Sequence, residues 1–129
     1  MKEIVHTKSA PEAIGPYSQG IKVKATEMLF CSSQLPIDAD SNQAVGRLPA
    51  EDARKVMDNL KAIIEAAGYS MNDVVKTTIY LTDLSVFNEV NEVYASYFTG
   101  EYKPARACVA VKTLPKGVDV EIEAIAFCN

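Results

Sequence analysis

The chain has 129 residues, of which 48% are hydrophobic and 23% charged, and its net charge is −4. This balance is typical of one folded domain over residues 1–129 and excludes a disordered chain. It contains no run of about 18 apolar residues, which excludes a helix that spans a membrane. Its lysines and arginines are scattered singly, which argues against nucleic acid as a partner.

Cysteine and histidine usage limits the kinds of site. There are three cysteines, with no CxxC pair, and one histidine, His6. The odd cysteine count and the lack of a secretory signal predict reduced thiols and a cytoplasmic protein. One histidine gives no metal-ligand cluster, and it allows a serine triad only if His6 serves in it. There is no glycine-rich phosphate motif, so we expect neither a metal nor a cofactor.

The N-terminal part, residues 14–38, is rich in turns. Two glycines and a proline surround Tyr17, so this aromatic ring sits in a loop built for tight geometry. Such a ring packs inward or forms the wall of a pocket. The short apolar run Met28–Cys31 predicts a buried strand that ends at Ser32 and Ser33, for which a polar strand end is the simpler interpretation.

The clearest predicted element is a helix that begins at Pro49 and stops at Gly68. Proline suits the first helical turn, and glycine suits the position after the last. Acidic residues follow the proline, where the positive end of the helix dipole favours them. One apolar stripe recurs at three- and four-residue spacing; it consists of Ala53, Val56, Met57, Leu60, Ile63, Ile64 and Ala67.

Three further elements complete the chain after this helix. β-Branched residues alternate along residues 74–81 and predict a strand with Val75, Thr77, Ile79 and Leu81 on one side. A second helix begins near Asp83 or Ser85 and ends at Gly100. Its inner stripe is Phe87, Val90, Tyr94, Tyr97 and Phe98. Two strands, residues 107–112 and 118–127, follow.

Both helices are apolar on one face only, so the order strands, helix, strand, helix, strands predicts an α+β fold. We expect a mixed sheet with the two helices packed side by side on one of its faces. Alternation along the last two strands makes the other face partly apolar as well. A two-layer domain would leave that apolar face exposed, and this predicts an oligomer.

Charged side chains on apolar strands are the first candidates for chemistry. Arg106 and Cys108 share one face of a strand, as do Glu121 and Glu123 on the last strand. A guanidinium offers a planar fork for a carboxylate, and Pro104 fixes the backbone that leads into Arg106. The simpler alternatives remain open: a surface salt bridge for the arginine, a solvated edge strand for the glutamates, and a small core residue for Cys108.

Taken together, these residues resemble the reactive intermediate deaminase family (Rid, also called YjgF-like). The resemblance runs from about Ser9 to Phe127. The matching stretches are Ala13–Gly20 (AIGPYSQG), Cys31–Pro36 (CSSQLP), Glu65–Gly68 (EAAG), Val75–Leu81 (VKTTIYL), Pro104–Val109 (PARACV), Leu114–Pro115 and Val120–Ala126 (VEIEAIA). It implies a chorismate-mutase-like fold, a homotrimer with clefts between subunits, and no cofactor or metal. It also implies hydrolysis of enamines and imines, such as 2-aminoacrylate and 2-iminopropanoate, to 2-keto acids and ammonia.

The resemblance also implies roles for single residues. Arg106 would pair with the substrate carboxylate, and Glu121 would position and activate the attacking water. Cys108 would contribute backbone groups near the imine nitrogen, and Tyr17 and Ser32 would line the pocket.

Two positions need separate comment. Ser33 stands where many members have glycine; a serine keeps the backbone N–H that assists the carboxylate, but its Cβ narrows the space. From the second helix, Phe87 and Asn91 are further candidates for the cleft.

Three other functions remain open from the sequence. One is a module that binds small carboxylates without turnover, and another is a ribonuclease or translation inhibitor, which the acidic balance disfavours. The third is a thiol-reactive chaperone or redox sensor, for which no paired cysteine motif exists.

Overall fold

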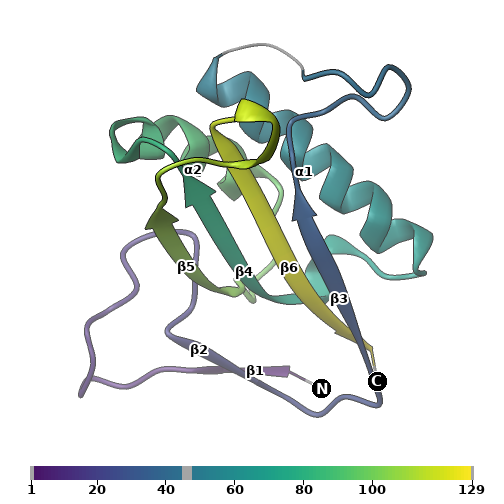
Figure 1. Cartoon of the computed structure of the whole chain (residues 1–129). Coiled ribbons are helices and arrows are strands. Elements are labelled where there is room, and N and C mark those ends of the chain that lie inside the picture. The colour runs from purple at the N-terminus through teal and green to yellow at the C-terminus, as the bar shows by residue number, and fades with distance from the viewer. Residues whose placement is uncertain (1, 45–47, 129) are drawn as a thin grey trace.

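The computed structural model describes residues 2–44 and 48–128 as an α+β sandwich with a small N-terminal sheet (Figure 1). Its elements, in chain order, are β1 (Lys2–Val5), β2 (Gly20–Val23), β3 (Glu27–Gln34), α1 (Pro49–Ala66), η1 (Met71–Asp73), β4 (Val74–Leu81), η2 (Leu84–Val86), α2 (Phe87–Ser96), β5 (Ala105–Ala110), η3 (Pro115–Gly117) and β6 (Val120–Cys128). Within these described ranges, no helix is both long and apolar enough to cross a bilayer.

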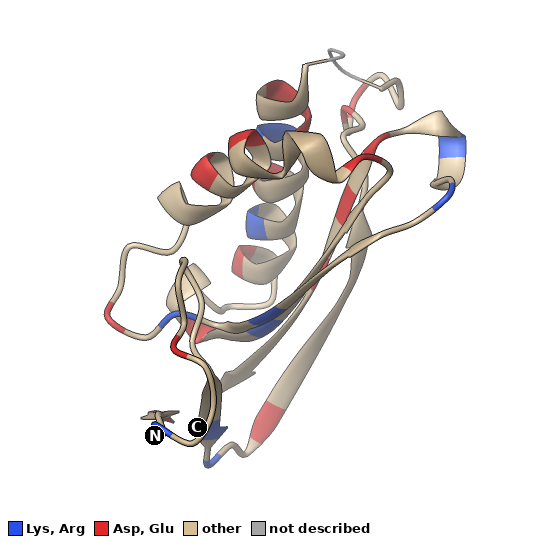
Figure 2. Ribbon diagram, turned by 90° about the vertical axis from the view of Figure 1, so that its left-hand side faces the viewer, with Lys and Arg blue, Asp and Glu red and all other residues tan. Residues whose placement is uncertain are grey.

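The main sheet is mixed, as predicted. Its strand order is β3-β6-β4-β5, with β4 and β5 parallel and β6 antiparallel to both of its neighbours. Helices α1 and α2 lie together on one face of this sheet (Figure 2), and their apolar stripes form the core with it. This is the predicted α+β architecture.

Helix α1 follows the sequence prediction closely. Pro49 begins it, and the chain leaves it through Gly68, whose φ of 85° lies in the left-handed region that glycine tolerates. The stripe is buried at Ala53, Val56, Met57, Leu60 and Ile64, whereas Ile63 is half-buried. Ala67 lies one residue past the helix end and is exposed, so its assignment to the stripe was wrong.

Strand β4 has the predicted bounds and the predicted buried side. Helix α2 is shorter than predicted, because η2 precedes it and it ends at Ser96 rather than Gly100. The carboxylate of Asp83 accepts the backbone N–H of Ser85 at 2.9 Å, which fixes η2 as a separate turn before the helix. Val90 and Tyr94 of the predicted stripe are fully buried.

Three strand predictions need correction. β3 runs through Ser32 and Ser33 to Gln34, with an irregularity in its pairing with β6 after Cys31. β5 begins two residues earlier than predicted, at Ala105, because the backbone pairs there with Lys76 of β4. β6 spans Val120–Cys128 rather than residues 118–127, since η3 occupies the preceding residues and Val118 closes it.

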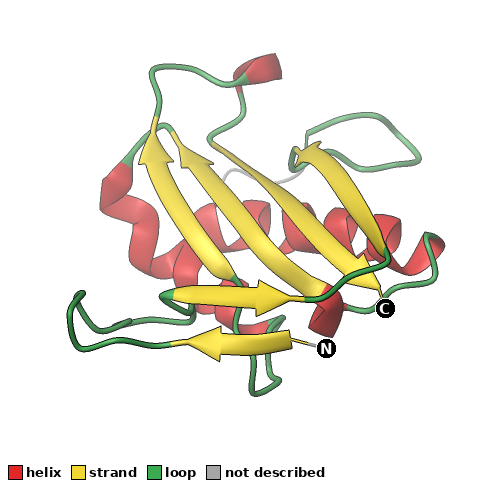
Figure 3. Cartoon of the chain, turned by 90° about the horizontal axis from the view of Figure 1, so that it is seen from below, coloured by secondary structure: helices red, strands yellow, loops and turns green. Residues whose placement is uncertain are grey.

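The N-terminal sheet of β1 and β2 was not predicted. The two strands pair antiparallel along their whole length, and Figure 3 shows them lying across one end of the main sheet. β1 is mostly exposed, so it shows no alternation between buried and exposed positions that a sequence pattern would reveal.

The face of the main sheet opposite the helices, here called the open face, is partly apolar, as predicted. Along β6, every second residue from Val120 to Ala126 is buried toward the helices, and Glu121, Glu123 and Ile125 point the other way. Phe30 is 69% exposed, Met28 47% and Val109 41%. The prediction of a buried strand was therefore wrong for Met28 and Phe30. Val109 belongs to the alternation in the last two strands from which an oligomer was predicted.

Candidate functional site

Arg106 occupies the second position of β5, where the N-terminal loop holds the strand in place. The backbone N–H of Ser18 donates to the carbonyl of Pro104 at 3.1 Å, and its hydroxyl donates to the carbonyl of Lys103 at 2.5 Å. Ser18 is buried although it is polar, because both of its groups are satisfied in this way. The loop that carries Tyr17 is therefore fixed beside the start of β5.

The guanidinium of Arg106 is surrounded by aromatic rings. Its Cζ lies 4.9 Å from the ring centre of Tyr94, 5.3 Å from that of Tyr17 and 5.5 Å from that of Phe87. Its Nη1 donates to Oδ1 of Asn91 at 2.6 Å. Ring faces and an amide oxygen orient a cation without neutralising it.

This cation has no acidic partner in the described part of the chain. The ion pairs there join His6 to Glu12, Lys22 to Glu3, and Lys55 to Asp38. The surface salt bridge that was the simpler reading of Arg106 is thus not formed within residues 2–44 and 48–128. A half-buried guanidinium held by neutral groups retains donors for an anion.

Gly15 and Cys108 border the same guanidinium. A Cβ added to Gly15 would lie 3.6 Å from Nη2 of Arg106 and as close to the Tyr17 ring, so the loop backbone approaches the cation closely. Burial raises the pKa of the Cys108 thiol, and the charge of Arg106 opposes this only in part. The thiol therefore stays protonated at neutral pH, which does not suit a nucleophile.

A second group of polar side chains lies on the open face. The hydroxyl of Tyr80 donates to Oε1 of Glu123 at 2.9 Å, and the hydroxyl of Ser33 donates to the same oxygen at 3.4 Å. Partial burial raises the pKa of the Glu121 carboxyl, and the neighbouring charge of Glu123 raises it further. Ser32, next to Ser33, is exposed.

The strand register separates these two groups. Arg106 pairs with Thr77, whose buried hydroxyl is 2.7 Å from the hydroxyl of Tyr94 in α2, so Arg106 faces the helices. Glu121 pairs with Tyr80, three residues further along β4, and therefore points to the open face. The predicted residues thus form two clusters. The cluster around Arg106 contains Tyr17, Phe87, Asn91, Arg106 and Cys108. The residues outside it are Ser32, Ser33 and Glu121.

Tyr94 and Tyr80 belong to these clusters but were not among the predicted site residues. Phe87, Asn91 and Tyr94 are spaced at i, i+4 and i+7 on α2, so they share one helix face, and this spacing was a usable signal. Tyr80 had a signal only through its register with Glu121, which a single sequence does not reveal. Among residues 2–44 and 48–128, no three His, Cys, Asp or Glu side chains gather as metal ligands would.

Comparison with known proteins identifies the family. The model of the family described as endoribonuclease L-PSP matches residues 7–128. A RutC family protein of Pyrococcus horikoshii is 54% identical over 127 residues, covering 98% of each chain. A protein of Escherichia coli K12 named 2-iminobutanoate/2-iminopropanoate deaminase is 45% identical over 131 residues, again covering 98% of each.

Solved structures agree with this. A Rid family protein of Yersinia pestis superposes with a TM-score of 0.77 at 42% identity, over 99% of this chain and all of the other. Escherichia coli TdcF, solved with bound serine, superposes with a TM-score of 0.75 at 42% identity, over 98% and 99%. The resemblance seen in the sequence motifs is thereby confirmed: this chain belongs to the L-PSP family, the family of the Rid and YjgF proteins.

Proposed function

We propose that this protein is a hydrolytic deaminase that converts 2-imino acids, such as 2-iminopropanoate, to 2-keto acids and ammonia. The observation that carries the proposal is the guanidinium of Arg106, which Asn91 and three aromatic rings hold without an acidic partner in the described chain. Such a cation is prepared to bind the carboxylate of a small substrate. The name of the Escherichia coli relative supports the same reaction.

The proposed site is shared between two chains of a homotrimer. Arg106 faces the helices and Glu121 faces the opposite side of the same sheet, so one chain cannot bring both to one small substrate. A second chain packed on the open face would cover Phe30 and Val109, whose exposure in one chain is otherwise unfavourable. A closed ring of such contacts would form one cleft at each subunit boundary.

Hydrolysis in this cleft requires water, a base and a fixed substrate. The water oxygen bonds to the imine carbon while the C=N π pair moves to nitrogen, and the carboxylate of Glu121 carries one water proton to that nitrogen. The resulting carbinolamine then loses its hydroxyl proton through the same carboxylate. As C=O forms, the C–N bond pair leaves with nitrogen, which takes that proton and departs as ammonia. Positioning and proton transfer supply the catalysis, with no cofactor in the scheme.

The remaining residues have supporting roles in this proposal. The rings of Tyr17 and Phe87 hold Arg106 and line the carboxylate end of the cleft. Cys108 lies two residues from Arg106 on the same face of β5 and would offer backbone groups near the imine nitrogen. Ser32 and Ser33 would border the cleft beside Glu121, where the backbone N–H of Ser33 can assist the carboxylate.

The test is to follow keto-acid release while a pyridoxal-phosphate dehydratase acts on serine and generates 2-aminoacrylate. Purified protein is expected to accelerate release well above the rate in buffer. Equal rates with and without the protein would reject the deaminase proposal. The second candidate is a module that binds carboxylates without turnover. Calorimetry with a 2-keto acid would support it if binding is measured while keto-acid release is not accelerated.

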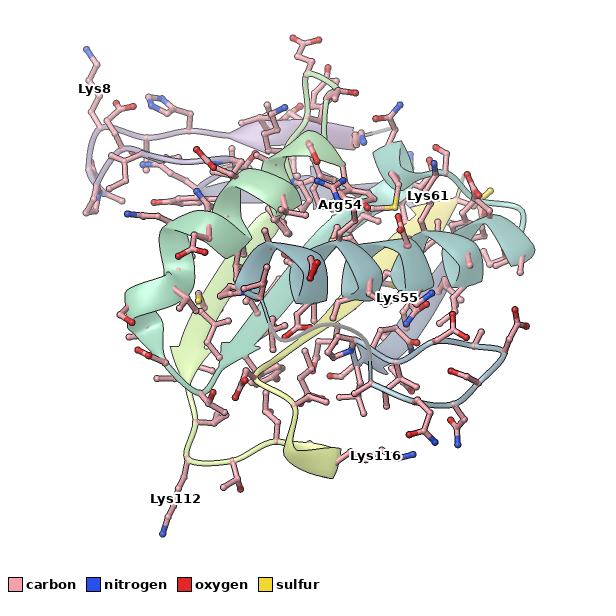
Figure 4. All side chains as sticks on the ribbon, turned by 90° about the horizontal axis from the view of Figure 1, so that it is seen from above. Lys8, Arg54, Lys55, Lys61, Lys112 and Lys116 are labelled. Carbon is pink, nitrogen blue, oxygen red and sulfur yellow. The ribbon has the colours of Figure 1, made fainter. Side chains whose placement is uncertain are left out.

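A ribonuclease activity is suggested by the description of the family, but the charge distribution of this chain does not favour it. The net charge is −4. Figure 4 shows its labelled cations spread over the N-terminal loop, α1 and the segment after β5, where they do not form a single basic face. We also propose a cytoplasmic location, since an odd count of three cysteines without a CxxC pair suits a reducing compartment.

A further inference from the structure

The carboxylate of Glu123 is fixed by hydroxyls from both neighbouring strands. Tyr80 of β4 donates to its Oε1 at 2.9 Å, and Ser33 of β3 donates to the same atom at 3.4 Å. The hydrogen bond to Glu123 also raises the pKa of Tyr80, so the phenol keeps its proton and remains a donor. Two hydroxyl donors on one oxygen hold the Glu123 carboxylate in a fixed place.

This fixed carboxylate lies directly beside the proposed water-activating group. Glu121 and Glu123 are two residues apart on β6 and point from the same face. Tyr80 pairs in register with Glu121, and its hydroxyl reaches diagonally to Glu123. The ring of Tyr80 and the charge of Glu123 therefore flank Glu121 on two sides.

Among the groups on the open face, Glu123 is the charged group that acts on Glu121. β3 contributes Met28, Phe30 and Ser33 to this face, and β5 contributes Ala107 and Val109, none of which is charged. On β4, Lys76 pairs in register with Ile125, which lies further along β6 than Glu121. The Nζ of Lys76 donates to the carbonyl of Thr77 at 3.4 Å. Among described groups, Glu123 supplies the Coulomb contribution to the raised pKa of Glu121.

We propose that Glu123 is a positioning residue for Glu121: the hydroxyls of Tyr80 and Ser33 hold its carboxylate as a fixed negative charge beside the carboxylate that activates water. The inference rests on the deaminase proposal and deepens it. A fixed negative neighbour disfavours a second negative charge, so Glu121 binds a proton more readily and is a stronger base. In this proposal, the Ser33 side chain has a partner in Glu123, at a position where related motifs often carry glycine.

The acid limb of the pH profile of kcat/KM tests this directly, because it reports the ionisation of the free enzyme's base. Glu123→Gln keeps the shape of the side chain but removes its charge. Tyr80→Phe removes one of the two donors that hold the Glu123 carboxylate in place. Tyr69→Phe is the matched control, since it removes another hydrogen bond from a tyrosine hydroxyl to a glutamate, 2.7 Å from Glu27 and on the helix side of the sheet.

We expect Glu123→Gln to move the acid limb to lower pH and to lower the plateau rate. Tyr80→Phe should move the limb in the same direction by less, and Tyr69→Phe should leave it in place. Limbs that coincide with wild type for both test variants, at unchanged assembly size and melting temperature, would overturn the proposal. An inactive wild-type protein would instead reject the deaminase function itself, so the two failures are distinguishable.

Discussion

The Arg106 cluster and the Glu121–Glu123 pair differ in how far one chain completes them. Around Arg106, β5, α2 and the N-terminal loop supply every contact, and its partner Tyr94 is part of the core. Around Glu121, one chain supplies an acidic neighbour and two hydroxyl groups on a face that also exposes Phe30. The chain thus builds the binding half of the proposed site by itself and leaves the proposed catalytic half on its open face.

The largest expected effect comes from separating the two halves. Phe30→Asp places a carboxylate in the proposed subunit contact, where an unpaired buried charge costs several kcal/mol, about 3–5. We expect a species of lower mass in light scattering and deaminase activity at the background rate. Leu84→Asp is the control, because Leu84 is 54% exposed but lies on η2 rather than on the open face. An intact trimer with Phe30→Asp would show that the open face is not the contact.

Removing the base is the next largest change. Glu121→Gln should lower kcat/KM by about 10²- to 10⁴-fold, the usual contribution of general acid–base catalysis. In the wild type, burial and Glu123 raise the pKa of Glu121, so the rate should fall as the pH drops through that raised value and Glu121 takes up a proton. Rate measurements across pH should show this acid limb in the wild type and its loss in Glu121→Gln. An unchanged limb would assign the base to another group.

Removing the carboxylate clamp should have an effect of similar size. A hydrogen bond to a charged group contributes about 1.5–3 kcal/mol, so losing two from Arg106→Ala should lower kcat/KM by about 10²- to 10⁴-fold. Arg106→Lys should recover only part of this, because an ammonium lacks the planar fork. Arg54→Ala, at an exposed position of α1, is the control. Wild-type kinetics with Arg106→Ala would remove the arginine from its proposed role.

The smallest expected effect concerns the support beneath Arg106. The hydroxyls of Thr77 and Tyr94 are 2.7 Å apart, and their residues are 1% and 0% exposed. Tyr94→Phe leaves the Thr77 hydroxyl buried without this partner and should lower the free energy of unfolding by about 1–2 kcal/mol. Burial raises the pKa of Tyr94 to about 12, so this hydroxyl does not titrate between pH 6 and pH 9. The loss in free energy of unfolding should therefore be the same across that range. Urea titrations at several pH values test both statements.

Much of the fold was predictable because periodicity reports burial locally. The stripe from Ala53 to Ile64 predicted α1, and the alternation from Val75 to Leu81 predicted β4. The N-terminal sheet and the long β3 were missed for the converse reason. β1 is mostly exposed, and β3 carries its pairing irregularity at the two serines, where a polar pair resembles a strand end.

The sequence predicted which residues belong to the candidate site, but not that they divide between the two faces of the sheet. Motif context singled out Arg106, and Asn91 and Phe87 were further candidates from the second helix; the fold brings the three together. Alternation within one strand told which residues share a face, but the register between β4, β5 and β6 decides which face that is. Long-range pairing of this kind leaves no local signal, so the separation of Arg106 from Glu121 emerged only from the three-dimensional structure.

Subunit mixing tests this division most directly. Arg106→Ala and Glu121→Gln are each expected to be nearly inactive; the two chains are then co-expressed so that mixed assemblies form. If each site takes Arg106 from one chain and Glu121 from its neighbour, about a quarter of the sites in a random mixture contain both residues. We therefore expect about a quarter of wild-type activity. Mixed assemblies that remain as inactive as either variant alone would contradict the shared site.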